Sequence, residues 1–521
     1  MHNSVVVILP ALVLAGAALL VLVVDMFVRT KAVLAWVAAA GLVATAAVAI
    51  GQWITFKGGL SLNGRTPQMG FNYMVSNDRY GLFFTLLFCV VGVLTIMLSD
   101  AYIKARGSGR GEFYVLLLLI ISGMVGMVIA TDIIVFFIAF ELMSLPTYVL
   151  AGFLRRDSKS GEAAVKYFIN GALAAAILAF GLALLYGVSG DSNYNHIAAS
   201  LASPVGRTGL SIVALVLITV GFGFKIAAVP FHGWAPDVYE GAPTPVTAFM
   251  SVGVKAAAFA GFMKLLILAA APQWQVWVDA LIMLSVVTMV VGNVLALPQR
   301  NLKRMLAYSS IAHAGYLMLG VIAAGKLAGN SLFYTASHGI HPDAVDRLLS
   351  KITASQGTKA VLFYLVAYTF MNLGAFGLLV WIRNRHRFAY TLDEMAGLGR
   401  SMPWAAFAMM LFMLSLAGIP PLVGFWGKFY LFTAVVDAHY TWLAIIAVLM
   451  SAVSAYYYLR VVWYMYFRER PEDAVVVPEP AGRSLGVSAA LTIAVVAVVG
   501  LGLYPSPLID FARHALRYVL G

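Results

Sequence analysis

The feature that most constrains this 521-residue chain is a series of long apolar runs that recurs from one end to the other. A run of about 20 apolar residues is the length at which an α-helix crosses the hydrocarbon core of a bilayer. Lipid offers the backbone no hydrogen-bond partner, so such segments must be helical. The runs predict an all-α, polytopic membrane protein of about 14 spans: 4–28, 32–56, 80–99, 113–130, 132–153, 163–187, 208–230, 244–271, 276–297, 303–325, 357–382, 403–436, 440–466 and 485–504.

Composition excludes several functional classes. The chain is 62% hydrophobic and 11% charged, whereas a soluble domain is about 45–50% apolar and about 25% charged. Its one cysteine, Cys89, cannot form a disulfide within the chain or supply the thiolates that an iron–sulfur cluster needs. No glycine-rich nucleotide motif follows a strand, and we expect no haem or other metal. The net charge of +12 reflects basic loops of a membrane protein rather than nucleic-acid binding.

The distribution of Lys and Arg predicts the orientation. One set of alternate loops holds 18 of the 34 basic residues, the opposite set holds 10, and the remaining six fall inside the runs. Cytoplasmic loops are the more basic ones, so we expect the first set in the cytoplasm. An even number of spans then places both termini outside. We interpret 4–28 as the first membrane helix rather than a cleaved signal.

Two runs are interrupted by proline. The seventh contains Pro230 near its end, and the twelfth contains Pro420-Pro421. Proline removes a backbone donor and breaks a helix, and matching broken helices are typical of inverted-repeat transporters. Because the two breaks are five spans apart, we expect two five-helix repeats of opposite orientation. The predicted organisation is a three-helix segment, a first repeat, a second repeat, and a final helix and tail: 1–110, 111–272, 273–470 and 471–521.

Charged residues inside the runs are the candidate functional residues. A charge at mid-membrane costs about 2.5–3.5 kcal/mol on insertion scales. Such residues must therefore face the interior, pair, or line water. Glu141, Lys225, Lys255 and Lys428 meet this description. Each could belong to a structural ion pair. We favour a proton pathway, since a buried lysine can change its charge when a neighbouring carboxylate moves.

Two other lysines lie nearer the ends of their runs. Lys166 follows Glu162 by one helical turn, so it can form an i,i+4 ion pair at the membrane edge or join the pathway. Lys264 is expected to extend its amine toward the membrane surface, with a functional role as the alternative.

Three neutral polar residues near membrane depth complete the candidate set. Imidazole exchanges a proton near neutral pH, so His232 and His313 are candidate relays. Tyr457 stands in the sequence Tyr456-Tyr457-Tyr458. Such tyrosines form either an interfacial belt or part of a buried polar chain.

Three segments, 237–249, 302–313 and 418–429, resemble the antiporter-like subunits of respiratory complex I. The resemblance implies Glu141 and Lys225 as a proton-input pair, Lys255 as the central carrier and Lys428 as the exit-side lysine. It also implies that NADH, FMN, iron–sulfur clusters and quinone are bound by other subunits. The implied location is the bacterial inner membrane. The implied partners are small membrane subunits and another antiporter-like subunit.

Two other functions remain open. A D-type subunit of a multi-component sodium/proton antiporter shares this fold, and a non-transporting membrane scaffold is a third hypothesis. The polar stretch 326–356, with an amphipathic pattern at 343–351, is longer than usual for the family, and its role is open.

Overall fold

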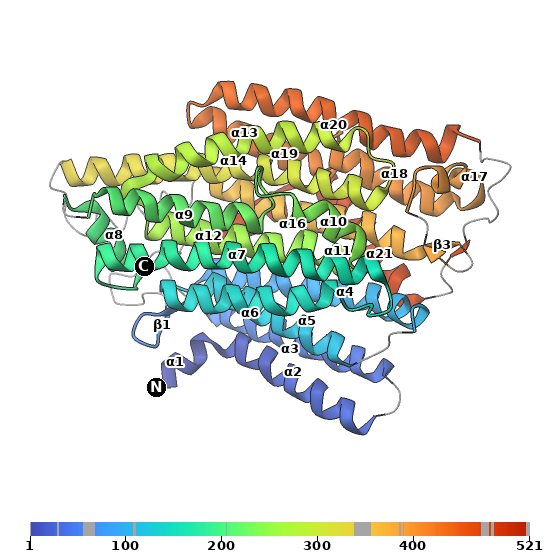
Figure 1. Ribbon diagram of the computed structural model, residues 1–521, viewed down its shortest axis with the longest axis horizontal. Coiled ribbons are helices and arrows are strands. Elements are labelled where there is room, and N and C mark those ends of the chain that lie inside the picture. Colours follow the sequence, from blue (N-terminus) through green and yellow to red (C-terminus); the bar gives the residue numbers. More distant parts are fainter. Residues whose placement is uncertain are drawn as a thin grey trace.

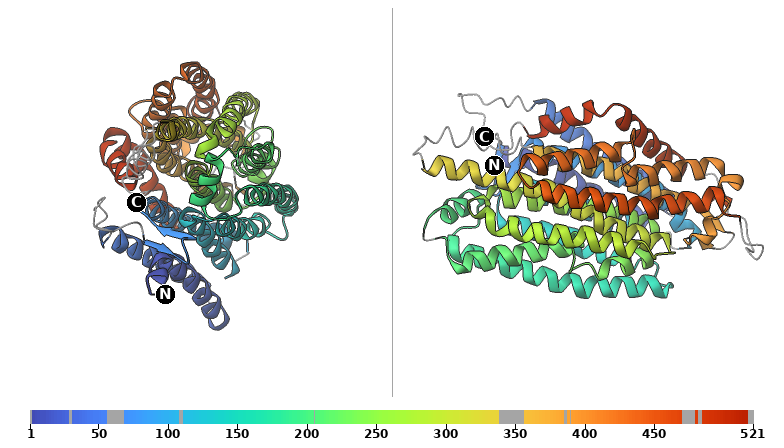
Figure 2. Two further views of the ribbon diagram at one scale, coloured as in Figure 1. Left: turned by 90° about the vertical axis from the view of Figure 1, so that its left-hand side faces the viewer. Right: turned by 90° about the horizontal axis from the view of Figure 1, so that it is seen from above.

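The computed structural model contains a bundle of long helices that run roughly side by side (Figures 1 and 2). Both termini lie at the same end of the bundle. The structure describes residues 2–28, 31–55, 68–107, 111–204, 206–337, 356–384, 387–388, 390–469, 479–480 and 484–516. The amphipathic pattern at 343–351 lies outside these residues.

Among the described residues, twelve helices are long and apolar enough to cross a membrane, or up to thirteen if one bent pair counts as a span. The all-α membrane fold is therefore confirmed. The count of 14 is not, because the interrupted runs 208–230 and 403–436 give helices too short to pass as spans. The long helices are α2 (Leu9–Phe27), α3 (Ala32–Thr55), α4 (Arg79–Ala105), α5 (Glu112–Ile129), α6 (Ile133–Ala151), α7 (Ser158–Ser189), α12 (Lys255–Leu268), which extends α11 (Thr244–Phe249), α13 (Trp274–Ala296), α14 (Leu302–Ser337), α16 (Gln356–Trp381), α20 (Thr441–Phe467) and α21 (Leu485–Leu503).

Shorter elements connect and interrupt these helices. The short helices are α1 (His2–Val7), α8 (Tyr194–Ala202), α9 (Gly209–Lys225), α10 (Trp234–Gly241), η1 (Met250–Val254), η2 (Ala271–Gln273), η3 (Asp393–Met395), α17 (Leu398–Ser401), α18 (Pro403–Ala417), α19 (Val423–Asp437) and α22 (Ser506–Leu516). The strands are β1 (Gln68–Gly70), β2 (Val75–Asn77), β3 (Ile382–Asn384), β4 (Arg387–Phe388) and β5 (Glu479–Pro480). The strands form two small antiparallel sheets, β1–β2 and β4–β3–β5.

Side-chain caps fix where several of these helices begin. Asp78, Asp132 and Asp157 each accept a hydrogen bond from a backbone N–H in the first turn of α4, α6 and α7. Thr208 and Ser211 form a capping box at α9. These residues satisfy donors that the helix itself leaves unpaired.

The first predicted break separates α9 from α10. The chain leaves the helix after Lys225, turns at Ala227 with a positive φ of 58°, and passes a cis peptide bond before Pro230. Backbone groups freed by the break find partners, as they must in lipid. The Phe224 carbonyl accepts a bond from Trp234 Nε1 at 3.2 Å, and the Val229 N–H donates to Thr288 Oγ1 at 3.0 Å.

The second predicted break separates α18 from α19. Gly418 has a φ of +90° there, and Pro420–Pro421 is cis. A Cβ on Gly418 would lie 2.9 Å from Cδ of Lys428. Both the backbone conformation and the close approach of Lys428 therefore require glycine.

A third irregularity was not predicted. The π-helical segment η1 lies inside the eighth run and ends one residue before Lys255. Short π-helical segments inside α-helices are frequently found at functional sites. The spans around Lys255 are also the most buried in the molecule: Thr244–Leu268, Leu302–Gly329 and Gln356–Trp381.

Candidate functional site

Three of the predicted lysines lie in the interior of the bundle. Lys225 is the last residue of α9, Lys255 the first of α12, and Lys428 lies in the second turn of α19. Their exposed fractions are 3%, 3% and 4%. Each lysine thus stands next to an interruption of its helix, where backbone carbonyls are free to act as acceptors.

Lys225 meets α6 through a hydroxyl group. Its Nζ donates to Ser144 Oγ at 2.7 Å, and the rings of Phe140, Tyr148 and Tyr167 lie within 6 Å of the amine. Glu141 lies one turn before Ser144 on α6 and forms no hydrogen bond or ion pair with Lys225. Its buried Oε1 has no hydrogen-bond partner among the described residues. The same helix therefore supplies the hydroxyl that contacts Lys225 and, one turn earlier, the predicted carboxyl group.

Lys255 contacts α14. Its Nζ donates to both the backbone carbonyl and the hydroxyl of Ser310, each at 2.5 Å. The ring of Tyr368 on α16 lies 5.9 Å from the amine. All of these contacts are with neutral groups.

A chain of neutral polar side chains begins beside Ser310. The hydroxyls of Ser309 and Tyr458 are hydrogen-bonded, and His313 contacts Tyr458 through Nε2 at 2.9 Å. His313 Nδ1 is hydrogen-bonded to the Tyr364 hydroxyl. The chain joins α14, α16 and α20, and it contains the predicted residue His313.

A second polar chain leads to Lys428. The Tyr457 hydroxyl donates to Asn293 Oδ1 at 3.0 Å, and Asn293 Nδ2 donates to the Tyr316 hydroxyl at 3.1 Å. Lys428 Nζ lies 5.2 Å from the Tyr316 ring centre. The ring centres of Tyr457 and Tyr458 are 4.4 Å apart, so the two chains are adjacent.

Lys428 itself is held at the second break. Its Nζ donates to the carbonyl of Ala417, the last residue of α18, and to Ser451 Oγ on α20, both at 2.8 Å. Two short hydrogen-bonded chains thus occupy the interval between Ser310, the partner of Lys255, and Lys428, but the bonds described do not form one continuous path. The described side chains form no such hydrogen-bonded link between Lys225 and Lys255.

The structure places two predicted residues outside these chains. His232 lies in the loop between α9 and α10, and its buried Nδ1 has no hydrogen-bond partner among the described residues. Lys166 forms the expected pair with Glu162 and a second pair with Asp237, both at 2.6 Å. It therefore belongs to a charge cluster at the end of the bundle.

That cluster ties α7, α10 and α14 together. Arg304 pairs with Asp237 at 2.6 Å and with Glu240 at 3.0 Å, and Lys159 pairs with Glu240 at 2.8 Å. Burial of Asp237 opposes its ionisation, but hydrogen bonds from Lys166 and Arg304 outweigh this and lower its pKa. The acid therefore stays charged at neutral pH.

An open groove of about 540 Å³ lies beside this cluster, between α7 and the α9–α10 break. Lys166 and Asp237 line it, together with Phe224 and Trp234. Trp234 stacks on Tyr167, with ring centres 4.4 Å apart. The ring of Tyr167 lies 5.9 Å from the amine of Lys225, so the stacked pair connects the groove lining with the surroundings of Lys225.

The prediction for Lys264 is wrong. Its amine does not reach the surface, because Lys264 Nζ pairs with Asp78 Oδ2 at 2.8 Å, both side chains being about 1% exposed. Ser76 Oγ and the Val128 carbonyl accept two more bonds from it. Unlike Lys225, Lys255 and Lys428, Lys264 has a carboxylate partner. That partner, Asp78, is 186 residues away in the sequence.

The buried pair gives a stability prediction. Substitution Lys264→Met leaves the Asp78 carboxylate buried without a cation, so we expect the protein to lose about 3–5 kcal/mol of stability. Thermal unfolding of the purified protein in detergent measures this loss. The double variant Asp78→Asn/Lys264→Met should recover most of it, because asparagine keeps the acceptor that caps α4. Lys104→Met, which breaks an exposed i,i+4 pair, is the control, with a cost below about 0.5 kcal/mol. Equal losses in both single variants would contradict the assignment.

Comparisons with known proteins give a consistent result. A family model described as "NADH:quinone oxidoreductase/Mrp antiporter, TM" matches residues 130–342 and 347–454. NADH-quinone oxidoreductase subunit N 2 of Roseiflexus castenholzii is 42% identical over 97% of this chain and 94% of its own length. Subunit N of Trichlorobacter lovleyi is 42% identical over 98% and 97%.

Solved structures show the same likeness. A chain of respiratory complex I from Thermus thermophilus with bound aureothin matches with a TM-score of 0.75 and 33% identity, over 96% of this chain and 98% of that chain. A chain of the Mrp complex from Dietzia sp. matches with a TM-score of 0.75 at 22% identity, over 99% and 97%. At that identity the second match is a likeness of fold.

Proposed function

Since this chain belongs to the NADH:quinone oxidoreductase/Mrp antiporter family of membrane subunits, as a member of its subunit N group, we propose that its buried lysines relay protons across the membrane. It is a proton-translocating membrane-arm subunit of NADH-quinone oxidoreductase, a multi-pass protein within a respiratory complex I. The antiporter alternative is not favoured, because the Mrp likeness is one of fold.

One observation carries the relay proposal. Lys225, Lys255 and Lys428 are buried, yet the hydrogen bonds of their amines go to hydroxyls and carbonyls and to no carboxylate among the described residues. A buried ammonium without a counter-ion is costly, so such a group gains by passing its proton on. Lys264, which has Asp78, is built instead as a permanent ion pair.

We assign the roles in order along the bundle. Glu141 and Lys225 form the input pair, and Ser144 contacts the Lys225 amine. Lys255 is the central carrier, and Lys428 is the exit-side group. His313 and Tyr457 belong to the polar chains between Lys255 and Lys428. Lys166 and His232 belong to the route by which protons reach Lys225: Lys166 lines the groove, and so do Phe231 and Gly233 on either side of His232.

We further propose how the chain fits its complex. NADH, FMN, iron–sulfur clusters and quinone belong to other subunits, which agrees with the single cysteine of this chain. Its neighbours are another antiporter-like subunit and small membrane subunits, in the bacterial inner membrane. The basic loops face the cytoplasm and both termini face outward. The repeats 111–272 and 273–470 each contain one broken helix with a lysine beside the break.

Removal of the Tyr458 hydroxyl tests the proposed exit route. Tyr458→Phe removes the group that bridges Ser309 and His313, so we expect proton translocation by the assembled complex to fall several-fold. The neighbouring Tyr456 is 62% exposed, and Tyr456→Phe is the matched control. Proton uptake into vesicles, driven by NADH and quinone, measures the effect. Equal rates for both variants would remove Tyr458 from the route.

A further inference from the structure

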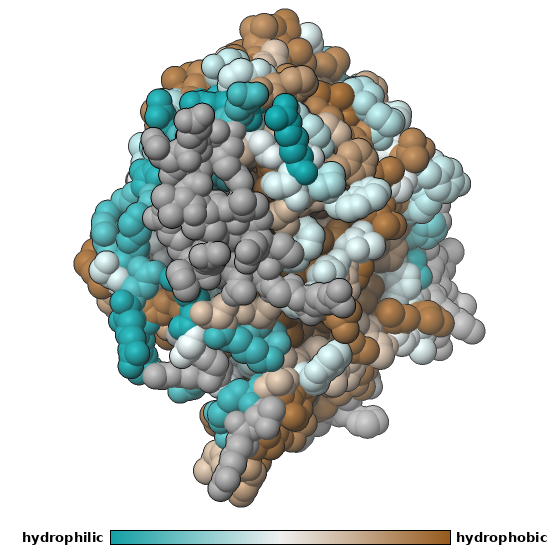
Figure 3. Space-filling model, turned by 90° about the vertical axis from the view of Figure 1, so that its right-hand side faces the viewer, coloured by the Kyte–Doolittle hydropathy of each residue, from teal (hydrophilic) through white to brown (hydrophobic). Residues whose placement is uncertain are grey.

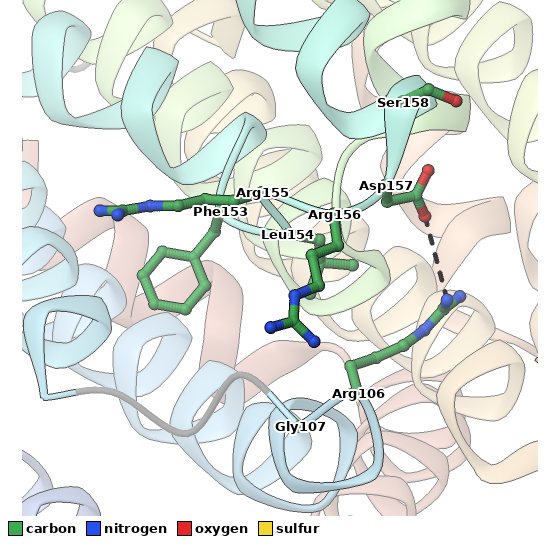
Figure 4. Close-up of a pocket in the computed structure, with 8 residues that line it drawn as sticks. All are labelled: Arg106, Gly107, Phe153, Leu154, Arg155, Arg156, Asp157 and Ser158. Atoms are coloured by element: carbon green, nitrogen blue, oxygen red, sulfur yellow. Dashed lines mark ion pairs between the residues drawn. The ribbon is translucent and has the colours of Figure 1, made fainter.

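A cavity of about 640 Å³ opens where α4 ends and the α6–α7 loop passes it (Figure 4). It is lined by Arg106 and Gly107 after α4 and by residues 153–158 of the loop. None of these residues contacts the lysines or tyrosines of the relay. The cavity lies at the end of the bundle that carries α17 and β3, where hydrophilic residues gather on the surface (Figure 3).

The cavity is rich in positive charge. Arg106, Arg155 and Arg156 line it, against the single acid Asp157. The distance between Arg106 Nη1 and Asp157 Oδ2 is 3.9 Å, which is long for an ion pair. Figure 4 shows the Arg156 side chain extending from the loop toward the end of α4, and Arg155 extending past Phe153 in another direction.

Two of these arginines differ from neighbouring cations. Arg155 and Arg156 form no ion pair with any residue that the structure describes. At the same end of the bundle, Lys104 pairs with Asp100 at 2.7 Å and Lys159 with Glu240 at 2.8 Å. The chain therefore pairs these two lysines with its own carboxylates, whereas Arg155 and Arg156 in the cavity have no such partner among the described residues.

The position of the cavity indicates the source of the balancing anion. The spanning helices α4, α6 and α7 all have an end here, at Ala105, Ala151 and Ser158, which is the depth of lipid headgroups. Phe153 packs on Phe113 behind the loop. Exposed apolar side chains follow one face of α6 up to this loop, at helical spacing: Ile138, Leu142, Leu145 and Val149.

We infer that this cavity binds the phosphate headgroup of an anionic phospholipid. The forked guanidinium donors of Arg156 match phosphate oxygens, Arg155 adds positive charge at the same loop, and the apolar face of α6 provides a track for an acyl chain. Basic pockets between spanning helices at the cytoplasmic side have the chemistry to hold such headgroups. A soluble phosphate has no acyl chain to contact the apolar face of α6, so the lipid is the better match. This inference does not depend on the proposed proton relay.

Photolabelling of the assembled complex tests the site. The purified complex is placed in phosphatidylcholine vesicles that contain either photoactivatable phosphatidylglycerol or photoactivatable phosphatidylcholine. Mass spectrometry then quantifies the label on peptides that carry Phe153–Ser158. Arg155→Gln/Arg156→Gln should lower labelling by phosphatidylglycerol about tenfold. Arg400→Gln, an exposed arginine on α17 away from the cavity, should leave it unchanged. Labelling by phosphatidylcholine should be weak in all cases.

Competition separates the sources of phosphate. Unlabelled phosphatidylglycerol should displace the probe, and a large excess of inorganic phosphate should not. Equal labelling of the double variant and wild type would overturn the inference. Displacement by inorganic phosphate would replace the lipid with a soluble anion. Cross-links from this loop only to a neighbouring subunit, without lipid label, would assign the arginines to a protein interface and also overturn it. Subunit content of each preparation confirms assembly.

Discussion

Substitution Lys255→Met is expected to reduce proton translocation by the assembled complex at least about tenfold, in the range of losses seen when a proton-transfer group is removed. Methionine resembles the lysine stem in length and fills the same space, so packing should survive. It cannot carry the proton that Lys255 would exchange next to Ser310. Quinone reduction should slow with it, because the two processes are coupled in the complex.

A matched control separates this effect from loss of charge in general. Lys104 is an exposed lysine, with 53% of its side chain accessible, in an i,i+4 pair with Asp100. Lys104→Met should assemble and pump at the wild-type rate. If Lys255→Met assembles fully and pumps as well as Lys104→Met does, the central role of Lys255 is wrong, and the scaffold hypothesis gains support.

The second large effect is expected at the input pair. Lys225→Met and Glu141→Gln should each reduce translocation at least about tenfold, and the double variant should be hardly worse than either single one, because residues that act as a unit are not additive. The structural reason is that α6 carries both Glu141 and, one turn later, Ser144, whose hydroxyl lies 2.7 Å from the Lys225 amine. Rates of NADH-driven proton uptake into vesicles measure all three variants.

Independent effects of the two substitutions would contradict the proposal that Glu141 and Lys225 act as a unit. If the losses of the two single variants multiply in the double variant, Glu141 and Lys225 act in separate steps. Ser144→Ala adds a check on the link itself. It removes the hydroxyl that accepts from Lys225 while Glu141 and Lys225 remain, so we expect a smaller, several-fold loss. Wild-type activity of Ser144→Ala would show that the hydroxyl takes no part.

Much of the fold was predictable from sequence because lipid imposes a local rule. A helix must supply about 20 apolar residues to cross, and proline breaks it wherever it stands. The spans, the breaks at Pro230 and Pro420-Pro421, and the presence of lysine beside them are therefore visible in the sequence. Helix α14 extends to Ser337, beyond its predicted end at 325, because its last turns are less apolar but still helical.

The candidate site was less predictable because its geometry is non-local. Tyr458, Ser309 and His313 meet although 145 or more residues separate Tyr458 from the other two. Asn293 and Tyr364 carry no signal in their local sequence, since any polar residue on an apolar helix looks the same until its neighbour is known. The same reason explains Lys264. Its carboxylate partner Asp78 comes from the start of α4, and no spacing rule connects them.

The structure suggests a rule for distinguishing these lysines. Lys264 has a carboxylate at 2.8 Å and three acceptors in all, which describes a fixed cation. Lys225, Lys255 and Lys428 have neutral acceptors and stand at helix interruptions. A buried lysine with neutral partners is adapted to change its charge, and one with a buried carboxylate is adapted to keep it.

The most direct test is a structure of the assembled complex at a resolution that locates ordered water. We expect water to bridge the interval between Lys225 and Lys255, where the described side chains form no hydrogen-bonded link, and to join the polar chains around His313 and Asn293 to Lys428. Close-packed apolar side chains throughout that interval, with no water beside the amines of Lys225 and Lys255, would contradict the relay.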